Sequence, residues 1–171
     1  NKTLDIFGSA IRLADDCETR KGLATSDNDR FLRLWFEVSK QNIGCNCQSN
    51  DEAQTRLEKW YPYNKGGSFR KWYGNFDYVA NWANDGFEMR NQKGSYIRNP
   101  QYYYRQGITW SSLGNTLALR FSPTGTMFET KGSVCFVKNG MTNYYLIALL
   151  NTTVARKIME ALSPTLDFHE G

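Results

Sequence analysis

The residues best suited to chemistry in this sequence are basic and aromatic side chains interleaved between positions 59 and 105. That segment carries eight lysines and arginines against three acids, a net charge of +5 in a chain whose total is +4. Its stretch from 60 to 104 also holds 14 of the 25 aromatic residues. Cations neutralise phosphates, and flat rings offer surfaces to sugars and bases. The pattern therefore indicates nucleic-acid binding, while the alternative is that the rings fill a core.

A glycine pair lies inside this segment, in the run Lys65-Gly66-Gly67-Ser68. Paired glycines can turn backbone N–H groups toward an anion, and Lys65 adds a positive charge. The other residues of a nucleotide-hydrolysing phosphate loop are missing. The run therefore predicts contact with a phosphate backbone or, as the alternative, a plain glycine-rich turn.

Side chains that pair with bases or phosphates can be named from their chemistry. Arginine is suited to paired hydrogen bonds with guanine, and asparagine or glutamine to adenine, for which Asn28 and Gln101 are candidates. The candidate DNA-binding residues are Asn28, Arg30, Lys65, Arg70, Lys71, Trp72, Tyr73, Arg98 and Arg105.

Metal binding and membrane insertion find little support. Cys45 and Cys47 are separated by one residue, where zinc knuckles usually have two or more, and His169 is the only histidine. We expect reduced, structural thiols and no metal site. The longest apolar stretch, 144–150, is too short to cross a bilayer, and no signal peptide opens the chain. We therefore expect a cytoplasmic protein.

The elements that position these residues should form one globular domain. The 171 residues can bury a core, and no repeat or low-complexity tract is present. The chain starts at Asn1 rather than methionine, so we expect residues 1–171 to be a single domain excised from a larger protein. The expected fold class is α+β, with a mixed or mainly antiparallel β-sheet and flanking helices.

In the first half, alternation of apolar residues predicts a strand over 31–38. Ser49 and Glu52 form the pattern of a capping box, which predicts a helix over 50–59 that ends at Tyr61-Pro62. The segments 70–73 and 78–82 are expected to form a hairpin around Gly74-Asn75.

In the second half, strands are expected over 107–110, 117–121, 126–130 and 133–137. Asn139-Gly140 predicts a hairpin that joins 134–137 to a strand over 144–149. Asn151 should cap a last helix, with Val154, Ile158 and Leu162 facing the sheet, before Ser163-Pro164 ends it.

Several segments resemble the PglX family, the adenine-specific DNA methyltransferases of BREX phage-defence systems. They are KWYPYNKGG (59–67), FRKWYGN (69–75), NWANDG (81–86), YYRQGITWS (103–111), RFSPTG (120–125), LLNT (149–152) and LSPT (162–165). The matching part of that family follows the methyltransferase core and is similar to the specificity domains of TaqI-type methyltransferases and type I specificity subunits. The resemblance covers nearly the whole chain.

The resemblance implies sequence-specific recognition of double-stranded DNA for a bacterial adenine-specific (N6) methyltransferase, while a catalytic domain of the same chain extrudes the adenine. It implies no cofactor in this fragment and S-adenosylmethionine in the parent enzyme. Other defence-system subunits are possible partners, and whether the parent also cleaves DNA, as a restriction-modification enzyme, stays open. The alternative is a protein-docking module of the same enzyme without direct DNA contact.

Two departures from the family pattern limit the comparison. Ser26 stands where the family has glycine, in a polar loop over 22–30, so a positive φ there would strain the backbone. The nearest match to the adenine-binding catalytic motif is Asn99-Pro100-Gln101-Tyr102, in which Gln101 replaces the second proline. We therefore expect the fragment itself to be no enzyme and to hold no catalytic residue.

Overall fold

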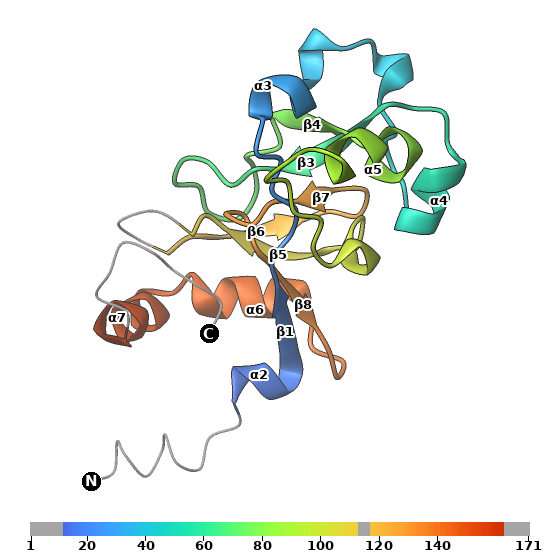
Figure 1. The fold of residues 1–171 in the computed structure, drawn as a ribbon. Helices are drawn as coiled ribbons and strands as arrows, with labels where there is room; N and C mark the ends of the chain where they lie inside the picture. Colours follow the sequence, from blue (N-terminus) through green and yellow to red (C-terminus); the bar gives the residue numbers. More distant parts are fainter. Residues whose placement is uncertain (1–11, 113–116, 163–171) are drawn as a thin grey trace, which may run out of the picture.

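The computed structural model describes residues 12–112 and 117–162, and it has the α+β class expected from the sequence. Two four-stranded sheets pack across a shared core, where one sheet was expected (Figure 1). The elements are α2 (Leu13–Asp16), β1 (Cys17–Arg20), α3 (Asn28–Phe31), β2 (Leu32–Leu34), the 3-10 turns η1 (Trp35–Glu37) and η2 (Lys40–Asn42), α4 (Asn50–Thr55), β3 (Trp60–Asn64), β4 (Tyr78–Asn81), α5 (Ala83–Arg90), η3 (Pro100–Tyr102), β5 (Gly107–Trp110), β6 (Leu119–Ser122), β7 (Met127–Phe128), β8 (Val134–Val137), α6 (Asn143–Leu150) and α7 (Thr153–Leu162).

The first sheet has the order β1-β8-β5-β6, and all its neighbouring strands are antiparallel. The second sheet has the order β2-β4-β3-β7, in which only β3 and β7 run parallel. The strand predictions for 107–110, 117–121, 126–130 and 133–137 are confirmed, with shifts of one or two residues and a shorter β7.

Aromatic side chains fill the space between the sheets. Five rings of the basic and aromatic segment are completely buried there, so for these the alternative of a core role is correct. They are Tyr61, Tyr63, Trp82, Tyr103 and Tyr104. A second core lies on the other face of the first sheet, where α6 packs through Leu146 and Ile147 (Figure 1).

The predicted hairpin over 70–82 is wrong. Residues 65–77 form a long loop between β3 and β4, and β4 pairs with β2 and β3 instead. Gly74 and Asn75 do adopt positive φ values, of 128° and 64°, but they bend the loop rather than join two strands. The hairpin does not form because the Trp72 backbone bonds to β6.

The second predicted hairpin is also wrong, because 143–150 is a helix. Asn139 and Gly140 form the expected turn, with φ values of 53° and 77°. Thr142 Oγ1 then accepts a hydrogen bond from the Tyr145 backbone N–H and starts α6. An apolar run without alternation suits a buried helix as well as a strand, so the capping threonine decides the outcome.

Two elements of the first half are shorter than expected. The strand ends at Leu34, whose N–H donates to Glu37 Oε2 in the following 3-10 turn, and Phe36 is exposed. Ser49 caps α4 as predicted, but the helix ends at Thr55 and leaves Leu57 fully exposed. The 61–62 pair lies inside β3 instead of ending that helix.

The last helix begins as predicted, but its cap and its packing differ. Thr152 Oγ1 accepts the Ala155 N–H, while Asn151 turns its amide to β6. Val154 and Ile158 are 69% and 42% exposed, so the expected docking of this face on the sheet is wrong. The side chain of Leu162 and the stop at Ser163-Pro164 lie outside the described residues.

Candidate nucleic-acid interface

The loop over 65–77, between β3 and β4, gathers more of the expected DNA-binding residues than any other element (Figure 1). It carries Lys65, Arg70, Lys71, Trp72 and Tyr73 within nine positions. Three of its aromatic side chains, those of Phe69, Trp72 and Tyr73, are at least 55% exposed. Here, unlike in the buried core, rings and cations of the basic segment face solvent together.

The glycine run at the start of the loop lines a hollow of about 350 Å³. Gly66 and Gly67 both have positive φ, which glycine adopts without strain. The Gly66 N–H donates to Asn64 Oδ1, so this donor is already used inside the protein. Arg70 and Asp77 also line the hollow. Because the Asp77 carboxylate is negative, binding of an anion in this hollow is less favourable than the sequence predicted.

Trp72 is anchored to the edge of the first sheet. Its N–H donates to the Leu119 carbonyl at 2.9 Å, and its carbonyl accepts the Phe121 N–H at 2.8 Å. Its φ of 74° is unusual for a bulky residue, and these two hydrogen bonds hold the backbone in that conformation. The indole is therefore 55% exposed on a backbone that cannot easily turn away.

Lys71 is less available than the sequence predicted. Its Nζ donates to the main-chain carbonyl of Asn151 at 3.2 Å, so the lysine ties the loop to the turn between α6 and α7. Arg70 is exposed, and its main-chain oxygen accepts a hydrogen bond from Arg120. Arg70 is thus the better candidate for a phosphate contact.

A buried arginine lies beneath the loop. Arg120 on β6 is completely buried, and its Nε has no hydrogen-bond partner. Its other nitrogens reach only the Arg70 carbonyl at 3.4 Å and Ser111 Oγ at 3.3 Å. Within the described residues, no carboxylate forms an ion pair with it. Burial, followed by the nearby Arg70 cation, lowers the pKa of Arg120 to about 10.

Beside the loop, a carboxyl group is held in an apolar environment. Burial raises the pKa of Glu129 to about 7, against the opposing effect of Lys65 and Lys131. Near neutral pH this side chain therefore exchanges between a neutral form and a negative form. A neutral Glu129 leaves the charge of Lys65 uncompensated.

Arg98 and Arg105 lie elsewhere, around η3. Arg105 stacks on Tyr102 at 5.0 Å and Arg20 stacks on the same ring at 4.9 Å. Arg98 lines a shallow hollow together with Arg20 and Gln101. The structure thus forms a second basic group here, in which Glu18 pairs with Arg20 and leaves Arg98 and Arg105 as the cations without an ion pair among the described residues.

Asn28 and Arg30 lie in a third place, on α3. The Arg30 guanidinium donates to Gln92 Oε1 at 3.1 Å and pairs with Glu88 at 3.5 Å, so it holds α3 against α5. Asn28 Oδ1 accepts the Thr25 hydroxyl at 2.6 Å. In the same loop Ser26 has a φ of 56°, the strained conformation that the family's glycine suggested.

The expected residues therefore divide into three groups, and sequence reasoning missed two arginines. Arg20 lies outside the basic segment and joins Arg105 only through the pairing of β1 with β8. Arg120 could have been found from strand alternation, because it lies between Leu119 and Phe121, which face the α6 side. Asn99, at the imperfect motif, donates its amide N–H to the Lys21 carbonyl at 2.9 Å.

Other kinds of site are not visible in the described residues. All four cysteines carry free thiols, and no group of three or more metal-binding side chains occurs in the part of the chain that the structure describes. Over the same residues, no helix is both long and apolar enough to cross a membrane.

Two curated proteins match almost the whole chain. It is 38% identical over 171 residues to the adenine-specific methyltransferase PglX of Lacticaseibacillus casei (strain Zhang), which covers 95% of this chain. It is 36% identical over 174 residues to the adenine-specific methyltransferase BrxX of Escherichia coli O9:H4 (strain HS), which covers 99% of it. The chain spans 14% of the length of each relative. No family model matches it.

Proposed function

We propose that this chain, as a homologue of one segment of the adenine-specific methyltransferases PglX and BrxX, holds double-stranded DNA for such an enzyme. The S-adenosylmethionine site and the catalytic residues would lie in another part of the parent protein. In this proposal the 65–77 loop contacts the phosphate backbone, and the Arg98 and Arg105 group provides a second contact. Phage defence is the proposed setting.

The observation that supports this best is the buried charge of Arg120 beneath an exposed basic and aromatic loop. Among the described residues no carboxylate pairs with this guanidinium, and an unpaired buried charge disfavours folding, so an anion held at the surface of the loop would offset it. Arg70 and Trp72, whose backbones lie against Arg120, are exposed, and so is the next residue, Tyr73, so these side chains can meet a phosphate and a sugar.

The test is fluorescence anisotropy of labelled duplex DNA across a salt series, with the chain and an Arg70→Gln variant. Arg70→Gln should weaken binding and lower the slope of log affinity against log salt by about 0.9, the value for one lost phosphate contact. Lys40→Gln, an exposed lysine on η2, removes the same charge away from the loop and should leave the slope unchanged. Equal slopes for Arg70→Gln and the parent chain would remove the loop from the interface.

A second candidate function is docking to the catalytic part of the same methyltransferase. It is favoured by apolar side chains that α6 and α7 leave exposed, namely Tyr145, Leu149, Val154 and Ile158. Such an interface would respond little to salt, whereas DNA binding weakens steeply as salt rises. Affinity of the chain for a separately expressed catalytic part, lost in Val154→Asp and insensitive to salt, would identify docking.

A further inference from the structure

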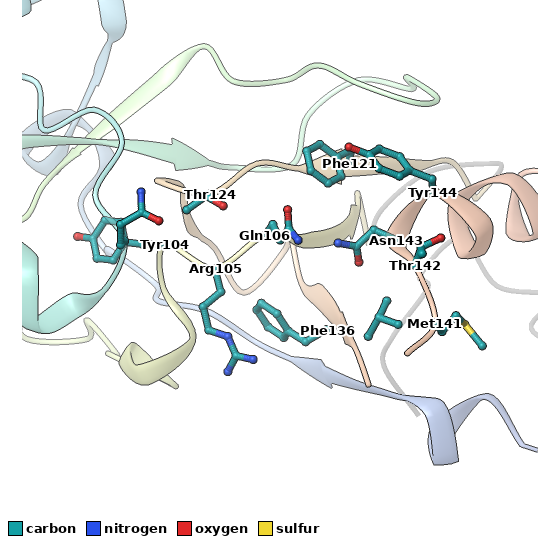
Figure 2. Close-up of a pocket in the computed structure, with 12 residues that line it drawn as sticks. Tyr104, Arg105, Gln106, Phe121, Thr124, Phe136, Met141, Thr142, Asn143 and Tyr144 are labelled. Carbon is teal, nitrogen blue, oxygen red and sulfur yellow. The ribbon is translucent and has the colours of Figure 1, made fainter. Parts of the chain in front are cut away.

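A pocket of about 670 Å³ opens on the far side of β6 from Arg120. Its walls come from the segment around Arg105, from β6 and β8, and from the start of α6 (Figure 2). The volume lies within the range of small-ligand sites and can hold one nucleotide. Of the candidate DNA-binding residues described above, only Arg105 lines this pocket.

Two carboxamides face the centre of this pocket. Figure 2 shows Gln106 and Asn143 pointing toward the same space from opposite sides. Among the described residues Asn143 Oδ1 is buried without a hydrogen-bond partner, which is unfavourable for the free protein and would be relieved if the amide turned toward a donor in the pocket. A carboxamide carries a donor and an acceptor side by side, the arrangement that matches the edge of a nucleobase.

Aromatic rings and one cation complete the walls. Phe121 and Tyr144 stack on each other, with centroids 5.5 Å apart and planes at 24°, and Tyr144 is 72% exposed. The Arg105 guanidinium lies 5.3 Å from the Phe136 ring and makes no ion pair within the described residues. A ring stacked on a base and an arginine near its phosphate are the usual contacts of single-stranded nucleic acids.

We propose that this pocket binds one unstacked nucleotide, with its base edge on Gln106 and Asn143, its base against Tyr144 and its phosphate near Arg105. The nucleotide comes either from an unpaired position in DNA or from a free nucleoside monophosphate. The first source rests on the proposed DNA-binding function, while binding of the nucleotide itself does not.

The test is an NMR titration of the ¹⁵N-labelled chain with the four deoxynucleoside 5′-monophosphates, following the side-chain NH₂ signals of Gln106 and Asn143. At least one nucleotide should shift both signals in a saturable way. Inorganic phosphate and 2-deoxyribose 5-phosphate should leave them in place, because neither carries a base. Absence of a saturable shift with all four nucleotides, or the same shift with the sugar phosphate, would overturn the proposal.

Variants and DNA probes locate the contact and its source. Tyr144→Ala should raise the Kd of the nucleotide about tenfold through loss of stacking, and Tyr144→Phe should restore it. Tyr145→Ala is the matched control, since it removes an exposed ring of the same helix that does not line the pocket. If Tyr144→Ala leaves the Kd unchanged, the proposed stacking is wrong.

A duplex with one extra unpaired nucleotide should shift the two amide signals if DNA is the source, and a fully paired duplex should not. Shifts caused by free nucleotides but by neither duplex would identify free nucleotides as the ligands of the pocket. Absence of duplex binding even at the lowest salt concentration would refute the proposed function and leave the mononucleotide result intact.

Discussion

Replacing Arg120 by methionine should make the protein more stable while it weakens DNA binding. Burial lowers the pKa of Arg120 to about 10, well below the range of an unperturbed arginine. Each pKa unit corresponds to about 1.36 kcal/mol, so the buried charge disfavours folding by about 3 kcal/mol at neutral pH. Above pH 10, and up to the pKa of a free arginine, the unfolded chain binds more protons at this residue, so the contribution of Arg120 to stability rises with pH only in that window.

Methionine also gives up two long hydrogen bonds, of 3.4 and 3.3 Å, to the Arg70 carbonyl and Ser111 Oγ. Their net value is about 1 to 2 kcal/mol. Neither acceptor residue is fully buried, so water can replace the lost donor. Arg120→Met should therefore raise the free energy of unfolding by about 1 to 2 kcal/mol, since loss of the buried charge outweighs loss of the hydrogen bonds.

Urea denaturation at pH 7, followed by tryptophan fluorescence, measures this change. Arg98→Met, at an exposed arginine, is the control and should stay within about 0.5 kcal/mol of the parent chain. Duplex affinity of Arg120→Met should fall in the anisotropy assay. A loss of stability above about 1 kcal/mol would refute the reasoning, because it would mean that the folded protein itself satisfies the Arg120 charge.

Three further results are expected. Glu129→Gln should raise the free energy of unfolding at pH 8 by up to about 3 kcal/mol and leave it unchanged at pH 4. The pKa of Glu129 in the folded protein is raised to about 7, so the parent chain loses this stability as pH rises from about 4.5 to 7. A series of denaturation measurements at different pH values tests this. Asn151→Ala should lower the unfolding free energy by about 2 to 4 kcal/mol, because the buried Leu119 backbone loses two hydrogen bonds and only its carbonyl keeps a donor, the Trp72 N–H. The cap variant Thr152→Ala should lose only about 1 kcal/mol, and equal losses would argue against this role of Asn151. Val154→Asp should change thermal stability of the isolated chain by less than about 0.5 kcal/mol, and a large loss would show that α7 is packed against the domain.

Much of the fold follows from local signals in the sequence. Ser49 caps α4 through its side chain, and the turn at Asn139-Gly140 adopts the expected positive φ values. The strand at Gly107–Trp110 lies between turn residues and forms where predicted. These elements depend on contacts within a few residues, so a single sequence is enough to find them.

The pairing of elements depends on distant contacts and was not predictable. The apolar 143–150 run suits a strand as well as a helix; the Thr142 cap starts a helix, and contact with the first sheet then fixes which face is buried. Likewise, the loop at Trp72 does not fold back on β4, because β6, almost fifty residues later in the chain, supplies its hydrogen-bond partners. Neighbourhood in the sequence therefore defines the basic segment, but it predicted the wrong hydrogen-bond partners for the backbone of that segment.

The same limit applies to the site. Lys65 and Arg70, two of the candidates, share one loop and line one hollow. Arg98 and Arg105, candidates from the same basic segment, lie around η3 with Arg20, which the chain brings in through β1. Arg30 was a candidate because arginine can bind a phosphate or a base, but in the structure its charge is paired with Glu88.

The outer edge of β6 ends its sheet, and three of its outward backbone groups are already occupied there. Trp72 takes the Leu119 carbonyl and the Phe121 N–H, and the Asn151 side chain bonds to the Leu119 N–H and carbonyl as a further strand would. An open strand edge is a template on which another chain can add and start aggregation. The loop and the single asparagine close that template without another strand, so Asn151→Ala should expose the protein to self-association as well as to unfolding.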